Sequence, residues 1–245
     1  MAALQIDCCA ERAGRLPGIR PFSRASLRSN VFARSAARQN SAISAAALSI
    51  IFALFAPRIH ACDSPDLKSP DQGKATVRFQ TTLGRIDIQI DLRRAPRTAC
   101  NFLKNAARTI YDGGNFGRTV RPDNQRGNSV PISVIQAYPN PSRAPDAVGP
   151  IALERTKGTG MQHRNGTVSM ARGSADDAVS EFFICVGSQP ELDYGGHRNP
   201  DGQGFAAFGR VVRGMGVVRR ILMSRAVGEK LNPPILIESA KLLSQ

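Results

Sequence analysis

A single arginine stands among apolar residues in the segment Asn115–Val120, NFGRTV, and it is the first candidate for chemistry in this 245-residue chain. A guanidinium stays protonated in proteins and offers five N–H donors in a rigid plane. Around Arg118 the sequence shows no activated nucleophile, no acid–base pair and no metal-ligand spacing. These residues alone leave open which chemistry a lone guanidinium could do there. On the sequence alone, the favoured interpretation of Arg118 is a surface arginine or the ion-pair partner of Asp112 or Asp123.

The sequence lacks the motifs of several other common enzyme classes. There is no GxSxG nucleophile turn, no HExxH helix and no CxxC pair. The glycines at 113–114 and 202–204 lack the spacing of a dinucleotide-binding loop. We therefore expect neither a metal site nor a cofactor.

The charge of the chain is strongly positive but evenly spread after residue 62. The formal net charge is +14, with three Tyr and no Trp. Binding of nucleic acid generally needs a basic patch, and stacking aromatics beside it for single strands. The sequence shows neither a run of basic residues nor such interleaving, so we expect no nucleic acid as the main partner.

Residues 1–61 differ from the rest in composition. No Asp or Glu occurs from Arg12 to Cys62, and Ala42–Ala56, AISAAALSIIFALFA, carries no charge. That run is shorter than the about 20 residues of a membrane-spanning helix, and it is typical of the apolar part of a secretion signal. Ala61 would precede a cleavage point. We therefore interpret 1–61 as a targeting segment and expect an exported protein, in a bacterial periplasm.

Several alternatives for this segment remain open from the sequence. Cys62 after a small residue also resembles the acylated cysteine of a bacterial lipoprotein, and an uncleaved run would anchor the chain in a membrane. An Arg- and Ser-rich, acid-poor segment also suits an organellar transit peptide, with an organelle lumen as the destination. The late apolar run suggests that translation starts nearer Val31. Residues 62–74, rich in Pro, Asp and Ser, predict a linker.

Residues 75–245 predict one mostly-β domain. Alternating apolar residues predict a hairpin from Thr76–Gln80 and Arg85–Ile90. Pro96 opens an amphipathic helix, and a second is expected at Val217–Met223. Further short strands are expected at Phe116–Val120, Val134–Tyr138, Gly166–Met170, Phe182–Val186, Ala206–Val212 and Ile235–Ile237. Many strands with two helices favour a closed barrel or a sandwich, and in a barrel the helices would plug the open ends.

Motifs in a fixed order between about residues 76 and 240 resemble the cyclophilins, which are peptidyl-prolyl cis-trans isomerases. They read APRTACNFL, FGRTV, VIQ, GTVSMAR, SEFFICVG, ELD and FAAFGRVVRGMGVV. The resemblance implies a closed eight-stranded antiparallel barrel capped by two α-helices. It implies an isomerase that acts on proline-containing polypeptides, and we expect a monomer. A barrel that binds proline segments with little turnover is the alternative.

The resemblance also assigns roles to individual residues. Arg118 takes the position of the catalytic arginine. Substrate-binding positions fall on Val134, Gln136, Ala171, Arg172, Phe183, Leu192 and Phe205. For Arg172 it is the backbone that would bind the substrate. Without the resemblance, Phe183 and Leu192 would be read as plain core and Gln136 as an outward strand residue.

Some positions depart from the usual cyclophilin pattern. Gly117 replaces His, Ser133 replaces Phe, Ala137-Tyr138 replaces Gly-Gly, Glu181 replaces Gln, and Glu191 replaces the Trp of cyclosporin-sensitive members. These changes leave the arginine in place but alter the pocket wall. We expect weak cyclosporin binding and a shifted substrate preference.

Overall fold

Strands β1 (Lys74–Thr81) and β2 (Gly84–Asp91) form the hairpin that the alternation predicts, with Lys74 opposite Asp91 and Thr81 opposite Gly84. The computed structural model describes residues 62, 73–125, 127 and 129–243. The expected targeting segment and most of the expected linker lie outside the described residues.

The strands close into a barrel. Their order is β1-β2-β7-β5-β6-β4-β3-β9, and β9 pairs back with β1, every pairing being antiparallel. The other members are β3 (Asn115–Val120), β4 (Val134–Tyr138), β5 (Thr167–Met170), β6 (Phe182–Cys185), β7 (Ala207–Arg213) and β9 (Lys230–Leu243). A short strand β8 (Ala226–Val227) pairs with β9 alone. The predicted eight-stranded antiparallel barrel is confirmed.

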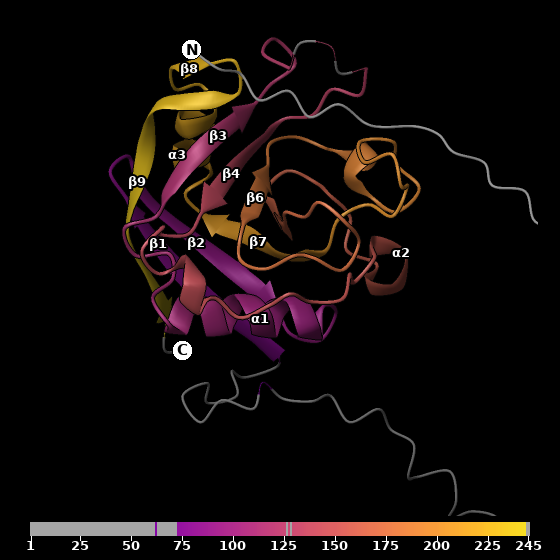
Figure 1. Cartoon of the computed structure of the whole chain (residues 1–245), viewed down its shortest axis with the longest axis horizontal. Coiled ribbons are helices and arrows are strands. Elements are labelled where there is room, and N and C mark those ends of the chain that lie inside the picture. Colours follow the sequence, from indigo (N-terminus) through magenta and orange to yellow (C-terminus); the bar gives the residue numbers. More distant parts are fainter. Residues whose placement is uncertain (1–61, 63–72, 126, 128, 244–245) are drawn as a thin grey trace, which may run out of the picture. The chain divides into compact units, whose positions relative to one another are not determined.

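Two helices lie at opposite ends of this barrel (Figure 1), as the sequence predicts. Helix α1 (Pro96–Ala107) starts at the predicted proline, and α3 (Met215–Leu222) starts two residues before the predicted start. Each turns an apolar face inward. The structure adds a one-turn helix α2 (Thr156–Thr159) and two 3₁₀ turns, η3 (Ala144–Asp146) and η4 (Pro190–Leu192), which are too short to produce a helical pattern in the sequence. No helix among the described residues has the length and apolar character to cross a bilayer.

Strand β9 is much longer than the sequence indicates. Only Ile235–Ile237 was expected. Pro233 and Pro234 lack the N–H that a strand interior needs, so nothing local predicts the longer strand. In the structure the ladder with β3 is interrupted there: Phe116 pairs with Ile235, but Arg118 pairs with Lys230. The residues between bulge out of the ladder, so the prolines cause no lost hydrogen bond.

An aromatic cluster fills the barrel. Six rings lie with neighbouring centroids 4.9–6.2 Å apart, in tilted and edge-to-face arrangements. They are Phe79, Phe102, Tyr111, Phe116, Phe182 and Phe208, all fully buried. The Tyr111 hydroxyl donates to the carbonyl of Ser180 at 2.8 Å, which satisfies its polar end.

Strand β6 is buried on both faces, and this creates a second apolar cluster. Phe182 and Ile184 point into the barrel, whereas Phe183 and Cys185 point outward. The outward pair packs against Val120, Ile132, Val134 and Leu192. Segment 186–206 contributes Leu192 and Phe205 to this outer cluster, which forms the floor of the site described below.

Gly214, which precedes α3, has a backbone conformation that only glycine adopts readily. Its φ is +97°, and a Cβ there would lie 2.3 Å from the Arg85 carbonyl oxygen. We expect Gly214→Ala to lower the free energy of unfolding by at least about 2 kcal/mol, measured by chemical denaturation. Gly216→Ala lies inside the helix, and its Cβ would meet only Arg220 Nη1, at 4.0 Å, so this change should be neutral or slightly stabilising. Equal effects of the two substitutions would contradict this account.

Candidate functional site

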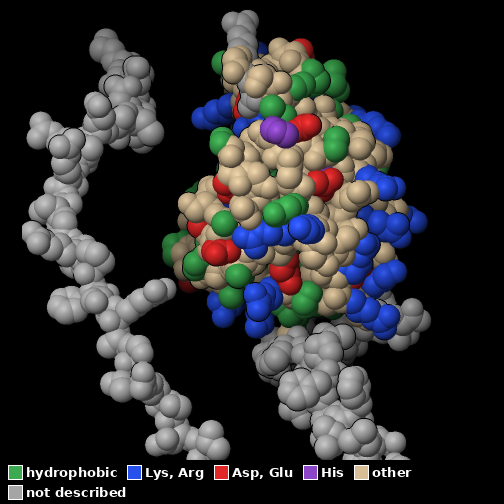
Figure 2. All heavy atoms as spheres, turned by 90° about the vertical axis from the view of Figure 1, so that its right-hand side faces the viewer, with side chains coloured by type: hydrophobic (Ala, Val, Ile, Leu, Met, Phe, Trp, Pro, Cys, Tyr) green, Lys and Arg blue, Asp and Glu red, His purple; other side chains and the backbone are tan. Residues whose placement is uncertain are grey.

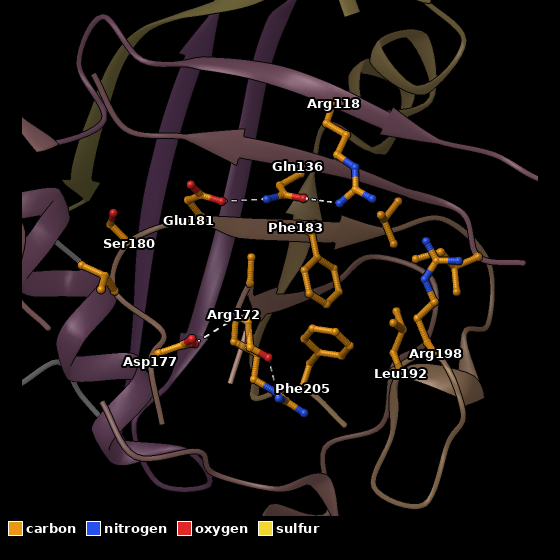
Figure 3. A pocket seen from close by; sticks show the side chains of 15 residues that line it. Arg118, Gln136, Arg172, Asp177, Ser180, Glu181, Phe183, Leu192, Arg198 and Phe205 are labelled. Carbon is orange, nitrogen blue, oxygen red and sulfur yellow. Dashed lines mark hydrogen bonds between the residues drawn. The ribbon is translucent and has the colours of Figure 1, made fainter. Parts of the chain in front are cut away.

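The strand register places the main candidate residues in one row on the outer face of the barrel. Arg118 on β3 lies opposite Gln136 on β4, and Gln136 lies opposite Phe183 on β6. Phe183 in turn lies opposite Ser169 on β5. Directly opposite residues share a face of the sheet. The row therefore spans four strands, and Figure 3 shows its first three side chains around one hollow.

A β-bulge at Gly117 brings Arg118 into this row. Phe116 pairs with Ala137, but Arg118 pairs with Gln136, so β3 uses one residue more than β4 between the two pairs. Plain alternation would turn Arg118 to the same face as Phe116, into the barrel. The extra residue reverses that direction, as bulges beside functional sites often do.

Two departures from the usual cyclophilin pattern are neighbours in space at this bulge. A Cβ on Gly117 would lie 3.1 Å from Cδ2 of Tyr138 and 2.7 Å from Oδ1 of Asn115. The ring of Tyr138 therefore lies against the position where a side chain at 117 would begin. The two changes are complementary: β3 has no side chain at Gly117, and the ring of Tyr138 on β4 occupies that space.

The row borders a hollow of about 460 Å³, a volume suited to a small ligand or a few residues of a peptide. All eight residues assigned from the resemblance line it: Arg118, Val134, Gln136, Ala171, Arg172, Phe183, Leu192 and Phe205. Phe183 and Phe205 meet edge-to-face at 5.4 Å and make an apolar slot with Leu192. Ile132 and Arg198 also line the hollow and were not predicted.

The Arg118 guanidinium is held from two sides. Glu229 Oε2 accepts from Nε at 2.8 Å and from Nη2 at 2.6 Å, and Gln136 Oε1 accepts from Nη1 at 2.8 Å. The ion-pair partners considered from the sequence were wrong. Asp123 bonds to Arg121, and an Asp112 carboxylate oxygen accepts from the Ala240 amide. Arg118 is thus an anchored side chain at the rim of the hollow, about one-third exposed.

Gln136 links Arg118 to a carboxylate on the far side. Its Nε2 donates to Glu181 Oε2 at 2.8 Å. Because arginine only donates and an ionised carboxylate only accepts, the orientation of the amide is fixed by its two neighbours. Gln136 is 8% exposed and lines the hollow on the outer face of the barrel, so it is not a solvent-facing strand residue. Burial raises the pKa of Glu181, and the bond from Gln136 and the charge of Arg118 oppose that rise.

The side chain of Arg172 supports the pocket wall. Nη1 and Nη2 donate to the carboxylate of Asp201 at 2.8 and 2.9 Å, and Nε donates to the Gly204 carbonyl at 2.8 Å. The guanidinium lies 5.1 Å from the centroid of the Phe205 ring. Arg172 therefore fixes Phe205 and the segment before it, while its expected backbone contact with a substrate stays a prediction.

A buried polar triplet beneath the floor was not predicted. His163 contacts Asp193 Oδ1 through Nδ1 at 2.7 Å and Ser169 Oγ through Nε2 at 2.9 Å. The groups resemble a hydrolytic Ser–His–Asp set, but Ser169 is fully buried and His163 is 1% exposed, so no substrate reaches them. The His163 ring stacks on Phe183 at 6.0 Å, which fixes the slot from behind. Asp193 lies 30 residues from His163, too far for the set to form a local signal.

Arg198 fastens two loops at the edge of the hollow. Its Nη1 donates to Gln125 Oε1 at 2.8 Å and to the Val130 carbonyl at 2.9 Å. Gln125 in turn brackets the backbone of Ile132, with its Nε2 2.6 Å from the carbonyl oxygen and its Oε1 3.1 Å from the amide nitrogen. This bracketing places Ile132 in the pocket wall. Nowhere in the described part of the chain do three His, Cys, Asp or Glu side chains gather as a metal site requires.

The fold and the hollow define a class: a closed antiparallel barrel with a hollow on its outer face. A family profile described as "Cyclophilin type peptidyl-prolyl cis-trans isomerase/CLD" matches residues 76–242. Peptidyl-prolyl cis-trans isomerase A of Dickeya dadantii is 32% identical over 177 residues, which cover 69% of this chain and 85% of that protein. The isomerase cyp18 of Streptomyces antibioticus is 32% identical over 175 residues, covering 69% and 99%.

A solved structure has the same fold. The crystal structure of a cyclophilin type peptidyl-prolyl cis-trans isomerase from Cryptosporidium parvum matches with a TM-score of 0.55 at 18% identity, over 70% of this chain and 99% of that one. The chain belongs to the cyclophilin family of peptidyl-prolyl cis-trans isomerases. The resemblance and the enzyme class expected from the sequence are confirmed.

The raised pKa of Glu181 leads to a stability prediction. The folded state holds the Glu181 proton more tightly than the unfolded chain, so the carboxyl favours folding at low pH and this contribution is lost as pH rises through the folded pKa. We expect Glu181→Gln to be more stable than the parent at pH 7, with the advantage shrinking as the solution is acidified. Thermal unfolding across pH measures it. Glu238→Gln, at an exposed position on β9, serves as control, and a destabilised Glu181→Gln at pH 7 would refute the account.

Proposed function

We propose that this protein accelerates the cis–trans isomerisation of X-Pro bonds in folding or unfolded polypeptides, and that Arg118 stabilises the twisted imide. The observation that supports this most is the position of Arg118. Its guanidinium is fixed at the rim of a hollow whose floor is the apolar slot of Phe183, Leu192 and Phe205. A donor beside an apolar slot is what a proline ring and its imide nitrogen require together.

The reaction makes and breaks no covalent bond. Its barrier of about 18–20 kcal/mol is the loss of amide resonance when ω is twisted. A catalyst has to bind the twisted form more tightly than either planar form. On twisting, the proline nitrogen becomes pyramidal and gains a lone pair that the planar amide lacks. A preorganised donor aimed at that nitrogen therefore stabilises the transition state selectively.

The other residues of the hollow divide the remaining tasks. Phe183, Leu192, Phe205 and Val134 would hold the proline ring, with Ala171 at the border of the slot. Gln136 keeps its oxygen on Arg118 and one N–H on Glu181, which leaves the second N–H of its amide for the peptide backbone. None of these steps needs a proton transfer.

Removing the guanidinium tests the mechanism. We expect Arg118→Ala to lower kcat/KM at least tenfold, about 1.4 kcal/mol in transition-state stabilisation, with the fold intact. NMR exchange spectroscopy of a short X-Pro peptide at substoichiometric protein measures the rate. Arg219→Ala, at an exposed position on α3, is the matched control. Near-normal turnover in Arg118→Ala would sink the mechanism, and peptide binding without exchange in the parent would indicate a binding module instead.

We also propose that the protein is exported and works as a monomer. The apolar segment 42–56 supports export, and so does a disulfide between Cys62 and Cys100 of α1, whose Cα atoms lie 5.5 Å apart. Disulfides persist mainly in oxidising compartments such as the periplasm. A sulfur bonded to Cys100 cannot also carry a lipid, so the lipoprotein alternative conflicts with this bond. On the face shown in Figure 2, hydrophobic side chains are scattered among charged ones, which supports a monomer.

The disulfide gives a direct test of the compartment. In protein isolated from its natural host without reductant, we expect Cys62 and Cys100 to resist alkylation until dithiothreitol is added. Peptide mass mapping should then find the two linked before reduction and separate after it. Cys100→Ser should expose the Cys62 thiol and serves as the control. Two free thiols in the isolated protein, or an acyl mass on Cys62, would contradict the proposal.

A further inference from the structure

Glu229 contacts Arg118 directly, although it lies 111 residues away in sequence. It sits in the two-residue turn Gly228-Glu229 between β8 and β9. One oxygen, Oε2, accepts from both Nε and Nη2 of Arg118, at 2.8 and 2.6 Å. The bond to Nη2 is the shortest of the hydrogen bonds that Arg118 makes.

The turn that carries Glu229 is itself fastened to β3. The Thr119 amide donates to the Glu229 carbonyl at 2.8 Å. The side chain of Asn124 donates to the carbonyls of Gly228 and Thr119, both at 3.0 Å. The backbone that carries the carboxylate is therefore fixed to β3, and the Glu229 side chain starts from a defined position beside Arg118.

Arg118 needs such an anchor because its side chain borders two hollows. One is the site already described. The other, of about 500 Å³, is lined by Arg118 together with Gly117, Tyr138, Glu229 and Leu231. An arginine with space on both sides can adopt several rotamers, and fixing one of them costs conformational entropy. Glu229 and Gln136 together engage three of the five N–H donors, which fixes the plane of the guanidinium and leaves two donors for a ligand.

We propose that Glu229 is a positioning residue for isomerisation, holding Arg118 in the orientation that meets the twisted imide. The inference rests on the proposed role of Arg118. The pair is partly exposed, so solvent screens it and its contribution to overall stability is small. The ion pair acts on the orientation of the Arg118 N–H groups. Because the imide nitrogen is uncharged, the direction of the N–H groups matters more than the net charge beside them.

The test separates positioning from charge and from folding. We expect Glu229→Ala to lower kcat at least fivefold with KM within twofold of the parent, because the slot that binds the proline ring is untouched. Glu229→Gln keeps an acceptor at the same reach and should recover at least half of the lost kcat. Glu238→Ala removes the same charge from β9 and should change neither constant. The rates come from NMR exchange of an X-Pro peptide over a range of peptide concentrations.

Two further measurements tie the effect to Arg118. In an Arg118→Ala background, Glu229→Ala should cause no additional loss. The Arg118 Nε–H signal, assigned by its disappearance in Arg118→Ala, should exchange faster with water in Glu229→Ala than in the parent. Unchanged or increased kcat in Glu229→Ala, a Gln variant as slow as the Ala variant, or a full additional loss in the Arg118→Ala background would each overturn the inference. If Arg118→Ala alone keeps normal turnover, the failure lies in the proposed mechanism instead.

Discussion

The pairing of β3 with β4 carries one residue more on β3, and the position of the site depends on this mismatch. Before the extra residue, β3 turns Phe116 into the aromatic interior. After it, Arg118 turns outward to the row that Gln136 and Phe183 share. A strand with regular alternation would turn the arginine into the aromatic interior, where the loss of hydration of its charge would be costly. The bulge lets one short strand serve both the core and the site.

The polar residues of the outer row and the two carboxylates beside it satisfy one another's hydrogen bonds. Glu229, Arg118, Gln136 and Glu181 form a continuous chain of hydrogen bonds in which donor and acceptor types alternate. Among the described residues, no buried side-chain nitrogen or oxygen is left without a partner. A chain with negative ends and a positive member inside keeps a fixed geometry beside an apolar slot, where a lone charge would be costly. The same arrangement keeps the donor fixed without surrounding it with protein.

The sequence foretold the parts of this structure that depend on local pattern. The hairpin β1–β2 and the start of α1 follow from alternation and from Pro96, both of which act within a few residues. The eight predicted residues of the hollow came from the resemblance, since nothing local distinguishes Phe183 from an ordinary core residue. The bulge, the Glu229 contact and the triplet under Phe183 could not be foreseen. Each depends on which residues meet across distant strands, and register is set by the closed barrel as a whole.

The hydroxyl of Tyr111 connects the barrel interior to the rim, and this has an optical consequence. The ring lies in the aromatic cluster, while its oxygen donates to the Ser180 carbonyl, next to Glu181. A ligand that displaces the 180–181 backbone alters the polarity around a chromophore that it never touches. Since the chain has three Tyr and no Trp, ultraviolet absorption and emission are unmasked by indole. The buried ring of Tyr111 is thus joined by one hydrogen bond to the backbone that borders the hollow.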